Sequence, residues 1–164
     1  MRLSRLLVAV VPLALAGCLG STEPTAYATV EGTTYSPDLG VDLANSTKLP
    51  DGVYYRDVTV GTGNAIAQGD SVGVYYVGNV FDGTPFDSLT VGAPNAPLRF
   101  RVGTQNLLLA FQEGVTGMKV GGRRQILIPP DLAYGLTGAS DANGFVLIPG
   151  NAVIVFMVDA AAIY

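Results

Sequence analysis

The side chains able to do chemistry here are mainly tyrosines and carboxylates, because the sequence has no His and a single Cys, Cys18. Without His there is no Ser–His–Asp or Cys–His catalysis and no His-based zinc site. One Cys makes neither an intramolecular disulfide nor a four-cysteine metal cluster. Carboxylates alone could still bind a metal, but no group of Asp and Glu has the spacing of a Ca²⁺-binding loop. We therefore expect a function based on binding and orientation, with no metal and no cofactor.

Aromatic residues are the other candidates for a functional site. Tyr76 and Phe156 each lie in a run where apolar residues alternate with others, so each shares a strand face with neighbouring Val or Ile residues. In an unrelated fold, ordinary core packing would explain such aromatics. A pocket becomes the better interpretation when other parts of the chain supply further aromatic and polar side chains.

The elements that must position these residues are strands and one short helix. Alternation and flanking turn residues predict strands at Val53–Val60, Ser71–Val80, Leu98–Val102, Gly122–Ile128 and Ala152–Val158. Apolar side chains recur on one face of Asn106–Val115, which predicts a short helix ending before Gly117. The expected fold class is α+β, a twisted antiparallel sheet of about five strands half-wrapped around the helix.

Composition and charge narrow the classes of partner. The 164 residues are 49% hydrophobic and 13% charged, with 21 Gly, which is typical of a turn-rich globular protein. The formal net charge is −4, and it is about −6, from 7 basic and 13 acidic residues, without Arg2 and Arg5 of the leader described next. An acidic chain without clustered Lys and Arg argues against a nucleic-acid partner. The one basic pair, Arg123–Arg124, is expected on a solvated strand face.

Residues 1–18 resemble a bacterial lipoprotein signal peptide. Two arginines precede the apolar stretch Leu6–Leu15, which is too short to span a bilayer core that needs about 20 residues. The sequence Leu-Ala-Gly-Cys ending at Cys18 is similar to a lipobox, in which the Cys receives a diacylglyceryl group that anchors the protein to a membrane. An ordinary secretory peptide with a chance Cys is the alternative. Leu19 at the next position resembles lipoproteins sent to the outer membrane, so we expect a bacterial envelope protein facing the periplasm.

Residues 19–50 are interpreted as a tether and a partly ordered N-terminal extension, and residues 51–164 as the domain. The stretch up to about Ala28 is small and polar, as in a flexible linker. Farther along, a short strand or an ordered wrap is suggested by loose alternation of Tyr35, Leu39, Val41 and Leu43. The clear strand signals come after Asp51, so the domain is expected to fold without the preceding segment.

Five collinear motifs resemble the FKBP (macrolide-binding immunophilin) family of peptidyl-prolyl cis–trans isomerases. They are VYYVG at residues 74–78, DGTPFDS at 82–88, FQEGVTGMKVGG at 111–122, PPDLAYG at 129–135, and Ile148-Pro149 with the strand containing Val155-Phe156. The similarity runs from about Gly52 to Ala160 in the right order and at the right spacing. It implies the family's fold and prolyl isomerase activity.

The resemblance also implies a site. By matching position, the residues carried over as catalytic are Tyr76, Asp87, Phe100, Tyr134 and Phe156. Those carried over as substrate-binding are Phe86, Leu98, Leu107, Leu108, Phe111 and Ile148. Phe111 would form the pocket floor, the Leu108 N–H would bind a substrate carbonyl, and the Tyr134 hydroxyl would donate to the bound peptide. The FDS and AYG turns are expected to place Phe86 and Tyr134 outside regular strands.

Departures from the family pattern affect substrate preference more than the core chemistry. Phe111 stands where eukaryotic members have Trp, Leu98 stands where Phe is common, and Ala110 replaces the usual Gly. The loop GLTGASDANGFVL at residues 135–147 is longer than in small family members, and it is expected to overhang the pocket mouth.

The resemblance implies proline-containing polypeptides as substrates, macrolides as ligands and the folding of envelope proteins as the role. A non-catalytic module that binds Pro-containing or unfolded proteins is the alternative, and a purely structural lipoprotein is a third hypothesis. The five residues carried over as catalytic favour catalysis. The sequence has no long insert resembling a dedicated chaperone flap.

Overall fold

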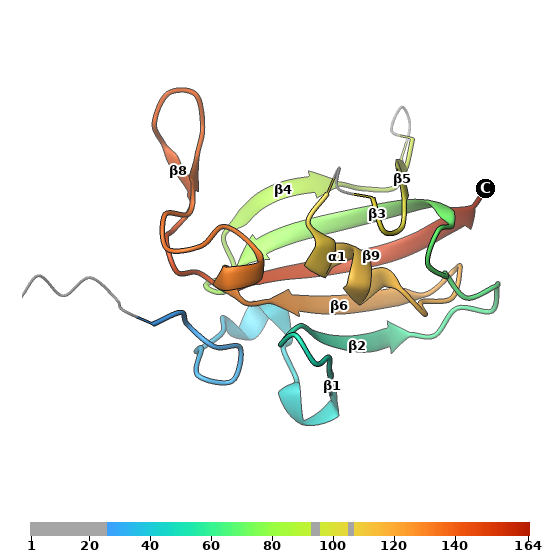
Figure 1. Ribbon diagram of the computed structural model, residues 1–164, viewed down its shortest axis with the longest axis horizontal. Helices are drawn as coiled ribbons and strands as arrows, with labels where there is room; N and C mark the ends of the chain where they lie inside the picture. The colour runs from blue at the N-terminus through green and yellow to red at the C-terminus, as the bar shows by residue number, and fades with distance from the viewer. Residues whose placement is uncertain (1–25, 93–95, 105–106) are drawn as a thin grey trace, which may run out of the picture.

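The computed structural model describes residues 26–92, 96–104 and 107–164, so the expected signal peptide with Cys18 and the start of the expected tether lie outside the described residues. The main sheet is antiparallel in the order β1–β2–β6–β9–β3–β4, with β5 also paired to β3 (Figure 1). Its strands are β1 (Thr47–Lys48), β2 (Tyr54–Thr59), β3 (Ser71–Val80), β4 (Pro85–Leu89), β5 (Leu98–Arg101), β6 (Arg123–Ile128) and β9 (Ile154–Ile163). Helix α1 (Leu109–Val115) lies across one face of this sheet. Within the described part of the chain, no helix has the length and apolar character to cross a membrane.

The predicted α+β class is confirmed, and the five predicted strands correspond to β2, β3, β5, β6 and β9. Strand β3 has the predicted bounds because its apolar alternation extends from end to end. Strand β9 runs to Ile163, farther than predicted. Strand β4 was not predicted at all. Phe86 therefore lies inside a strand, in contrast to the expectation, whereas Tyr134 lies in a turn as expected.

The helix is shorter than predicted. It begins at Leu109, and Leu108 precedes it with the non-helical angles φ −50° and ψ 121°. Its buried face packs on β6, where a Cβ at Gly114 would lie only 2.5 Å from Cγ2 of Ile126. Glycine at this position therefore lets the helix approach the sheet closely.

Arg124 is buried, which corrects the prediction that Arg123–Arg124 lies on a solvated face. Alternation along β6 turns Arg123 outward, whereas Arg124 is only 3% exposed. The Arg124 guanidinium donates to both carboxylate oxygens of Asp57, at 2.7 and 3.0 Å, and to the carbonyls of Gly114 and Thr116 at 2.9 and 3.0 Å. A paired cation at a helix C-terminus is favourable. Arg124 therefore fixes the end of α1 on the sheet.

The segment 26–50 packs against the other face of the sheet as an ordered wrap. It contains 3-10 turns at Pro37–Leu39 and Leu43–Asn45 and the short strand β1. Val30 of this segment is buried in a second apolar cluster, together with Tyr54, Leu127, Val153 and Val155. The four residues of the loose alternation, Tyr35, Leu39, Val41 and Leu43, pack against this cluster. The two faces of the sheet therefore bury two cores, one under α1 and one under the wrap.

A separate two-stranded hairpin follows the 3-10 turn Pro130–Leu132. Its strands are β7 (Ala139–Ser140) and β8 (Val146–Ile148). The hairpin projects from the body of the domain near one end of the sheet (Figure 1).

Candidate active site

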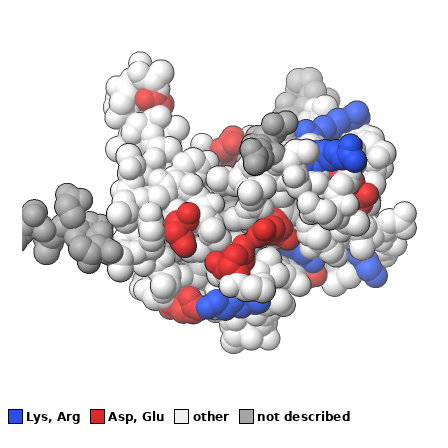
Figure 2. Space-filling view, in the orientation of Figure 1, with Lys and Arg blue, Asp and Glu red and all other residues white. Residues whose placement is uncertain are grey.

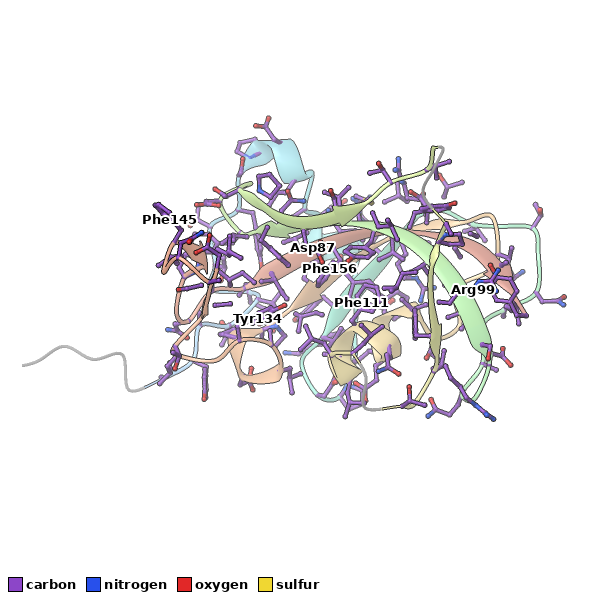
Figure 3. The ribbon with its side chains drawn as sticks, turned by 90° about the horizontal axis from the view of Figure 1, so that it is seen from above. Asp87, Arg99, Phe111, Tyr134, Phe145 and Phe156 are labelled. Atoms are coloured by element: carbon purple, nitrogen blue, oxygen red, sulfur yellow. The ribbon has the colours of Figure 1, made fainter. Side chains whose placement is uncertain are left out.

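A pocket of about 170 Å³ lies between the start of α1, strands β3, β4, β5 and β9, and the turn that carries Tyr134. Its lining residues are Tyr76, Phe86, Asp87, Leu98, Leu107, Leu108, Phe111, Tyr134 and Phe156. These are nine of the eleven residues that the sequence assigned to the site. Figure 3 shows Asp87, Phe111 and Phe156 close together over the sheet, with Tyr134 on the side nearer the hairpin.

Edge-to-face aromatic contacts build the floor and walls of the pocket. The ring centroids of Phe111 and Phe156 are 5.0 Å apart, and the Tyr76 ring lies 6.1 and 6.0 Å from them. Phe86 continues the cluster, at 5.6 Å from Phe156 and 6.2 Å from Tyr134. Such pairs prefer edge-to-face geometry, and each ring limits the movement of its neighbours. The pocket is therefore preformed and mostly apolar.

A β-bulge brings Phe86 and Asp87, which are adjacent in the sequence, to the same pocket. Gly78 of β3 pairs with Asp87, but the next residue, Asn79, pairs with Pro85, so Phe86 is the extra residue. In a regular strand, successive side chains point to opposite faces. The bulge removes this alternation and turns both side chains toward the same space. Sequence reasoning took this stretch for a turn and could not foresee the pairing.

Gly78 is a site residue that sequence reasoning missed. A Cβ at this position would lie 2.7 Å from Cζ of Phe86 and 2.8 Å from Cε1 of Phe156. Only a residue without a side chain lets both rings lie against the strand. A Gly in the interior of an otherwise apolar strand marks such a close approach, and this was the available signal.

The polar edge of the pocket is a hydrogen-bonded pair. The Tyr76 hydroxyl donates to Oδ2 of Asp87 at 2.6 Å. Burial, and then this hydrogen bond, raise the pKa of Tyr76 well above its usual range. Burial and the charge of Asp87 also raise the pKa of Tyr134. Both phenols are protonated at neutral pH, as an ordinary tyrosine is, and the raised pKa values extend this to more alkaline pH. Among the hydrogen bonds between described residues, none involves the Tyr134 hydroxyl.

Gln112 supports the wall that leads into α1. Its side chain is buried, its Nε2 donates to the carbonyls of Thr104 and Leu107 at 2.6 and 3.1 Å, and its Oε1 accepts from the Gly103 N–H at 2.7 Å. These bonds hold the backbone of Gly103, Thr104 and Leu107 in place. Sequence reasoning missed this residue too. The signal was a polar side chain four positions after Leu108, on the helix face that is otherwise apolar.

The two remaining predicted residues lie behind the pocket. Phe100 is buried in the main core, with its ring centroid 6.0 Å from that of Phe111. Ile148 is buried in the same core at the base of the hairpin. Neither lines the pocket, so each acts on it only through the side chains that it supports.

The long loop stands beside the pocket instead of over it. None of residues 135–147 lines the pocket. Most of the loop forms the β7–β8 hairpin, which extends away from the sheet, and Phe145 lies far from Phe111 and Phe156 in Figure 3. The expected overhang is therefore absent from this part of the described chain, because pairing of β7 with β8 directs the loop outward.

Comparison with known proteins shows which family carries this arrangement. The family model described as FKBP-type peptidyl-prolyl cis-trans isomerase matches residues 63–160, which contain the whole pocket. The chain belongs to this family. The FKBP assignment made from the five motifs is confirmed.

Known FKBP proteins resemble most of the domain. The chain is 40% identical over 111 residues to FK506-binding protein 4 of Dictyostelium discoideum, a match that covers 68% of this chain and 28% of that protein. It therefore spans less than a third of that relative. The crystal structure of AtFKBP13 has a TM-score of 0.64 and 31% identity, covering 73% of this chain and 98% of that one. A peptidyl-prolyl cis-trans isomerase of Pseudomonas syringae has a TM-score of 0.60 and 30% identity, covering 73% and 80%.

Proposed function

We propose that this FKBP-family protein is a peptidyl-prolyl cis–trans isomerase that acts on proline-containing polypeptides. The observation that carries the proposal is the preformed aromatic pocket with a single polar edge, made by Tyr76 and Asp87. Its volume of about 170 Å³ suits one prolyl ring. An apolar cavity of about 150 Å³, for comparison, accommodates a benzene molecule.

The apolar walls supply the main catalytic effect. Rotation about an X–Pro bond loses amide resonance, and the barrier is about 18–20 kcal/mol. The planar ground state carries more charge on its oxygen than the twisted state does, so it loses more when water is removed. A dry pocket made by Phe86, Phe111 and Phe156 therefore favours the twisted amide relative to the planar one. This step requires no nucleophile and no cofactor.

Polar groups around the rim hold the peptide in the reactive geometry. The Leu108 N–H, at the start of α1, is placed to donate to a substrate carbonyl, and no hydrogen bond between described residues uses it. The Tyr134 hydroxyl is a second donor, because a tyrosine is protonated at neutral pH. The Tyr76–Asp87 pair is a third polar group of the rim, close enough to Tyr134 for the Asp87 charge to act on it. Together they bind the chain on both sides of the prolyl ring and supply the orientation part of catalysis.

A protease-coupled assay on a short peptide with one X–Pro bond tests this proposal. Uncatalysed isomerisation takes tens to hundreds of seconds at 25 °C. Residues 26–164 should accelerate it in proportion to protein concentration. If the protein binds the peptide without accelerating isomerisation, then the alternative, a non-catalytic module that binds Pro-containing segments, replaces this proposal.

We further propose that the protein acts in a bacterial envelope, anchored by a lipid on Cys18. The Leu-Ala-Gly-Cys sequence and the position of the only Cys support lipid attachment, and Leu19 supports the outer membrane, facing the periplasm. Envelope proteins that contain proline would then be the substrates. The name of the Dictyostelium relative supports macrolides as a second class of pocket ligand.

A further inference from the structure

The tip of the β7–β8 hairpin exposes a cluster of apolar side chains. Phe145 is 71% exposed, Val146 is 67% exposed and Leu147 is 43% exposed. They are consecutive in the sequence: Phe145 follows the turn Asp141–Gly144, and Val146 and Leu147 continue into β8 toward its buried last residue, Ile148. These three residues are called the tip below. Residues 136–148 contain one charged residue, Asp141, and no Lys or Arg. Figure 2 accordingly shows the hairpin as uncharged apart from one acidic group.

Hydrogen bonds within the turn hold this tip in a fixed shape. Oδ1 of Asp141 accepts from the N–H groups of Asn143 and Phe145, both at 2.9 Å. The Asp141 N–H in turn donates to the Phe145 carbonyl at 2.9 Å. The single carboxylate therefore serves the turn and keeps Phe145 presented to the outside. An apolar group that is presented so rigidly is suited to bind something, because little entropy is lost when it does.

The chain enters the described fold at the base of the same hairpin. The Ala28 N–H donates to Oδ1 of Asn151 at 2.8 Å, and Nδ2 of Asn151 donates to the Ala26 carbonyl at 3.3 Å. Asn151 comes three residues after β8 ends at Ile148. Phe145 is six residues before Asn151. Six residues span at most about 20 Å, so the tip lies no farther than that from the point where the chain enters the fold.

The chain before Ala26 is long enough to reach the surface that the tip would touch. Cys18 precedes Ala26 by eight residues, which span up to about 27 Å when extended. A lipid on Cys18 and the side chain of Phe145 can therefore enter the same bilayer. The acyl chains of a diacylglyceryl group would hold the chain at the membrane, and a second contact through the domain would limit its rotation there.

We propose that Phe145, Val146 and Leu147 insert into the interfacial region of the bilayer to which the protein is anchored. The proposal rests on the lipid attachment at Cys18 proposed above. A projecting apolar tip suits the boundary between headgroups and acyl chains, where interfacial elements bury Phe and Leu side chains. The domain is acidic, so the contact is apolar and needs no anionic lipid. Insertion orients the domain and holds the pocket, which opens beside the hairpin, close to the membrane surface.

Tryptophan fluorescence tests the proposal, because the sequence contains no Trp. The chain starting at Cys18 carries the substitution Phe145→Trp and is coupled through its only thiol to a maleimide lipid in phosphatidylcholine vesicles. Coupling in vitro makes the result independent of whether cells lipidate Cys18. The emission should shift to shorter wavelength and be quenched by lipids brominated near the headgroup, equally at low and high salt.

Two variants make the result specific. Val60→Trp is the matched control, because Val60 is 65% exposed and follows β2, which ends on the side of the molecule away from the hairpin (Figure 1). The tryptophan emission of this variant should be neither shifted nor quenched. Leu147→Trp should repeat the quenching, and adding Phe145→Ser to it should reduce that quenching.

Absence of quenching in both hairpin variants, with the domain folded, would overturn the proposal. A shift that appears only when an unfolded proline-rich polypeptide is added would also overturn it and would assign the tip to substrate binding instead. Isomerase activity of the Phe145→Trp protein on a soluble peptide, measured in parallel, shows separately whether the proposed enzymatic function holds.

Discussion

The ring of Phe86 lies directly against the backbone of Gly78, where a Cβ would be 2.7 Å from its Cζ atom. The bulge in β4 aims the ring there, and the absence of a side chain in β3 leaves it room. The depth of the pocket thus depends on a residue that presents no functional group. This dependence can be measured by adding a single carbon atom.

Gly78→Ala should displace the rings of Phe86 and Phe156 and lower both stability and activity. Overpacking of this kind costs about 1–3 kcal/mol. The kcat/KM for an X–Pro peptide should fall further than that of Gly73→Ala, a change on the same strand where the added carbon meets mainly Tyr164 and Pro97 side chains. Equal effects of the two substitutions would show that the space beside Gly78 does not shape the pocket.

Tyr134→Phe should reduce kcat/KM about two- to tenfold, because one neutral hydrogen bond is worth roughly 0.5–1.5 kcal/mol. The melting temperature should barely change, since no described residue depends on that hydroxyl for a hydrogen bond. Tyr27→Phe, at an exposed tyrosine outside the pocket, is the control and should keep full activity. Full activity of the Tyr134→Phe protein would show that the hydroxyl takes no part in catalysis.

Val30→Ala should lower the free energy of unfolding by about 2 kcal/mol, because Val30 is fully buried and loses two methyl groups. Val60→Ala at an exposed position should change it by less than about 0.5 kcal/mol. A protein starting at Thr47 should be destabilised more strongly, since it exposes the cluster around Leu127 and Val155. Urea denaturation measures all three. Wild-type stability of the shortened protein would show that the wrap does not stabilise the domain. Cooperative unfolding of the shortened protein would support the expectation that the domain folds without the segment.

Glu113→Gln should raise the melting temperature at pH 8 and leave it nearly unchanged at pH 5. A hydrogen bond to the Asp51 carboxyl, and then burial, raise the pKa of Glu113 to about 7. The folded state therefore holds more protons than the unfolded state between about pH 4.5 and 7, so stability falls as pH rises through this window. Glu113 is exposed, so the effect is modest and weaker at high salt.

Glu31 is the control for Glu113, because its pKa is shifted in the opposite direction. Hydrogen bonds from Lys48 and Tyr54 lower the pKa of Glu31 to about 2, so its contribution is present above about pH 4.5 and is lost as pH falls through 2. Glu31→Gln should therefore lower the melting temperature at pH 8. Identical pH profiles for wild type and both variants would contradict the two assignments.

Cys18→Ser should abolish incorporation of fatty-acid analogues and leave the precursor uncleaved by the lipoprotein signal peptidase. The reason is that the acyl acceptor is a thiol and the sequence has no other. Metabolic labelling and the mass of the envelope-fraction protein report the result. Labelling that persists in the variant would disprove attachment at this residue.

Most of the sheet was predictable because the strands show their buried faces as an alternation of apolar residues in the local sequence. Val72, Val74 and Tyr76 alternate along β3, and the strand has the predicted ends. The helix start was less predictable, because Leu107 and Leu108 fit a helical spacing but are held outside the helix. Gln112 causes part of this difference by binding the backbone of Thr104 and Leu107.

The polar partners of buried groups could not be predicted from spacing. Arg124 is stabilised by Asp57, which is 67 positions away on a neighbouring strand, and by two carbonyls at the end of α1 that only the packing of the helix on the sheet brings within reach. Phe86 and Asp87 share the pocket through a register shift that depends on the pairing of β3 with β4. Family resemblance nevertheless identified both pocket residues, because it carries tertiary information that local patterns lack.

The hydrogen bond between Ala28 and Asn151 joins residues 123 positions apart, and this separation affects how the protein is made. At about 5–20 residues per second, synthesis supplies Asn151 roughly 6–25 s after Ala28. The wrap must also wait for the β9 residue Val155, against which it packs. The earliest part of the domain to emerge from the ribosome is therefore among the last to find its place. Throughout that interval the wrap has not yet found the surface against which it packs, so it stays accessible to other proteins.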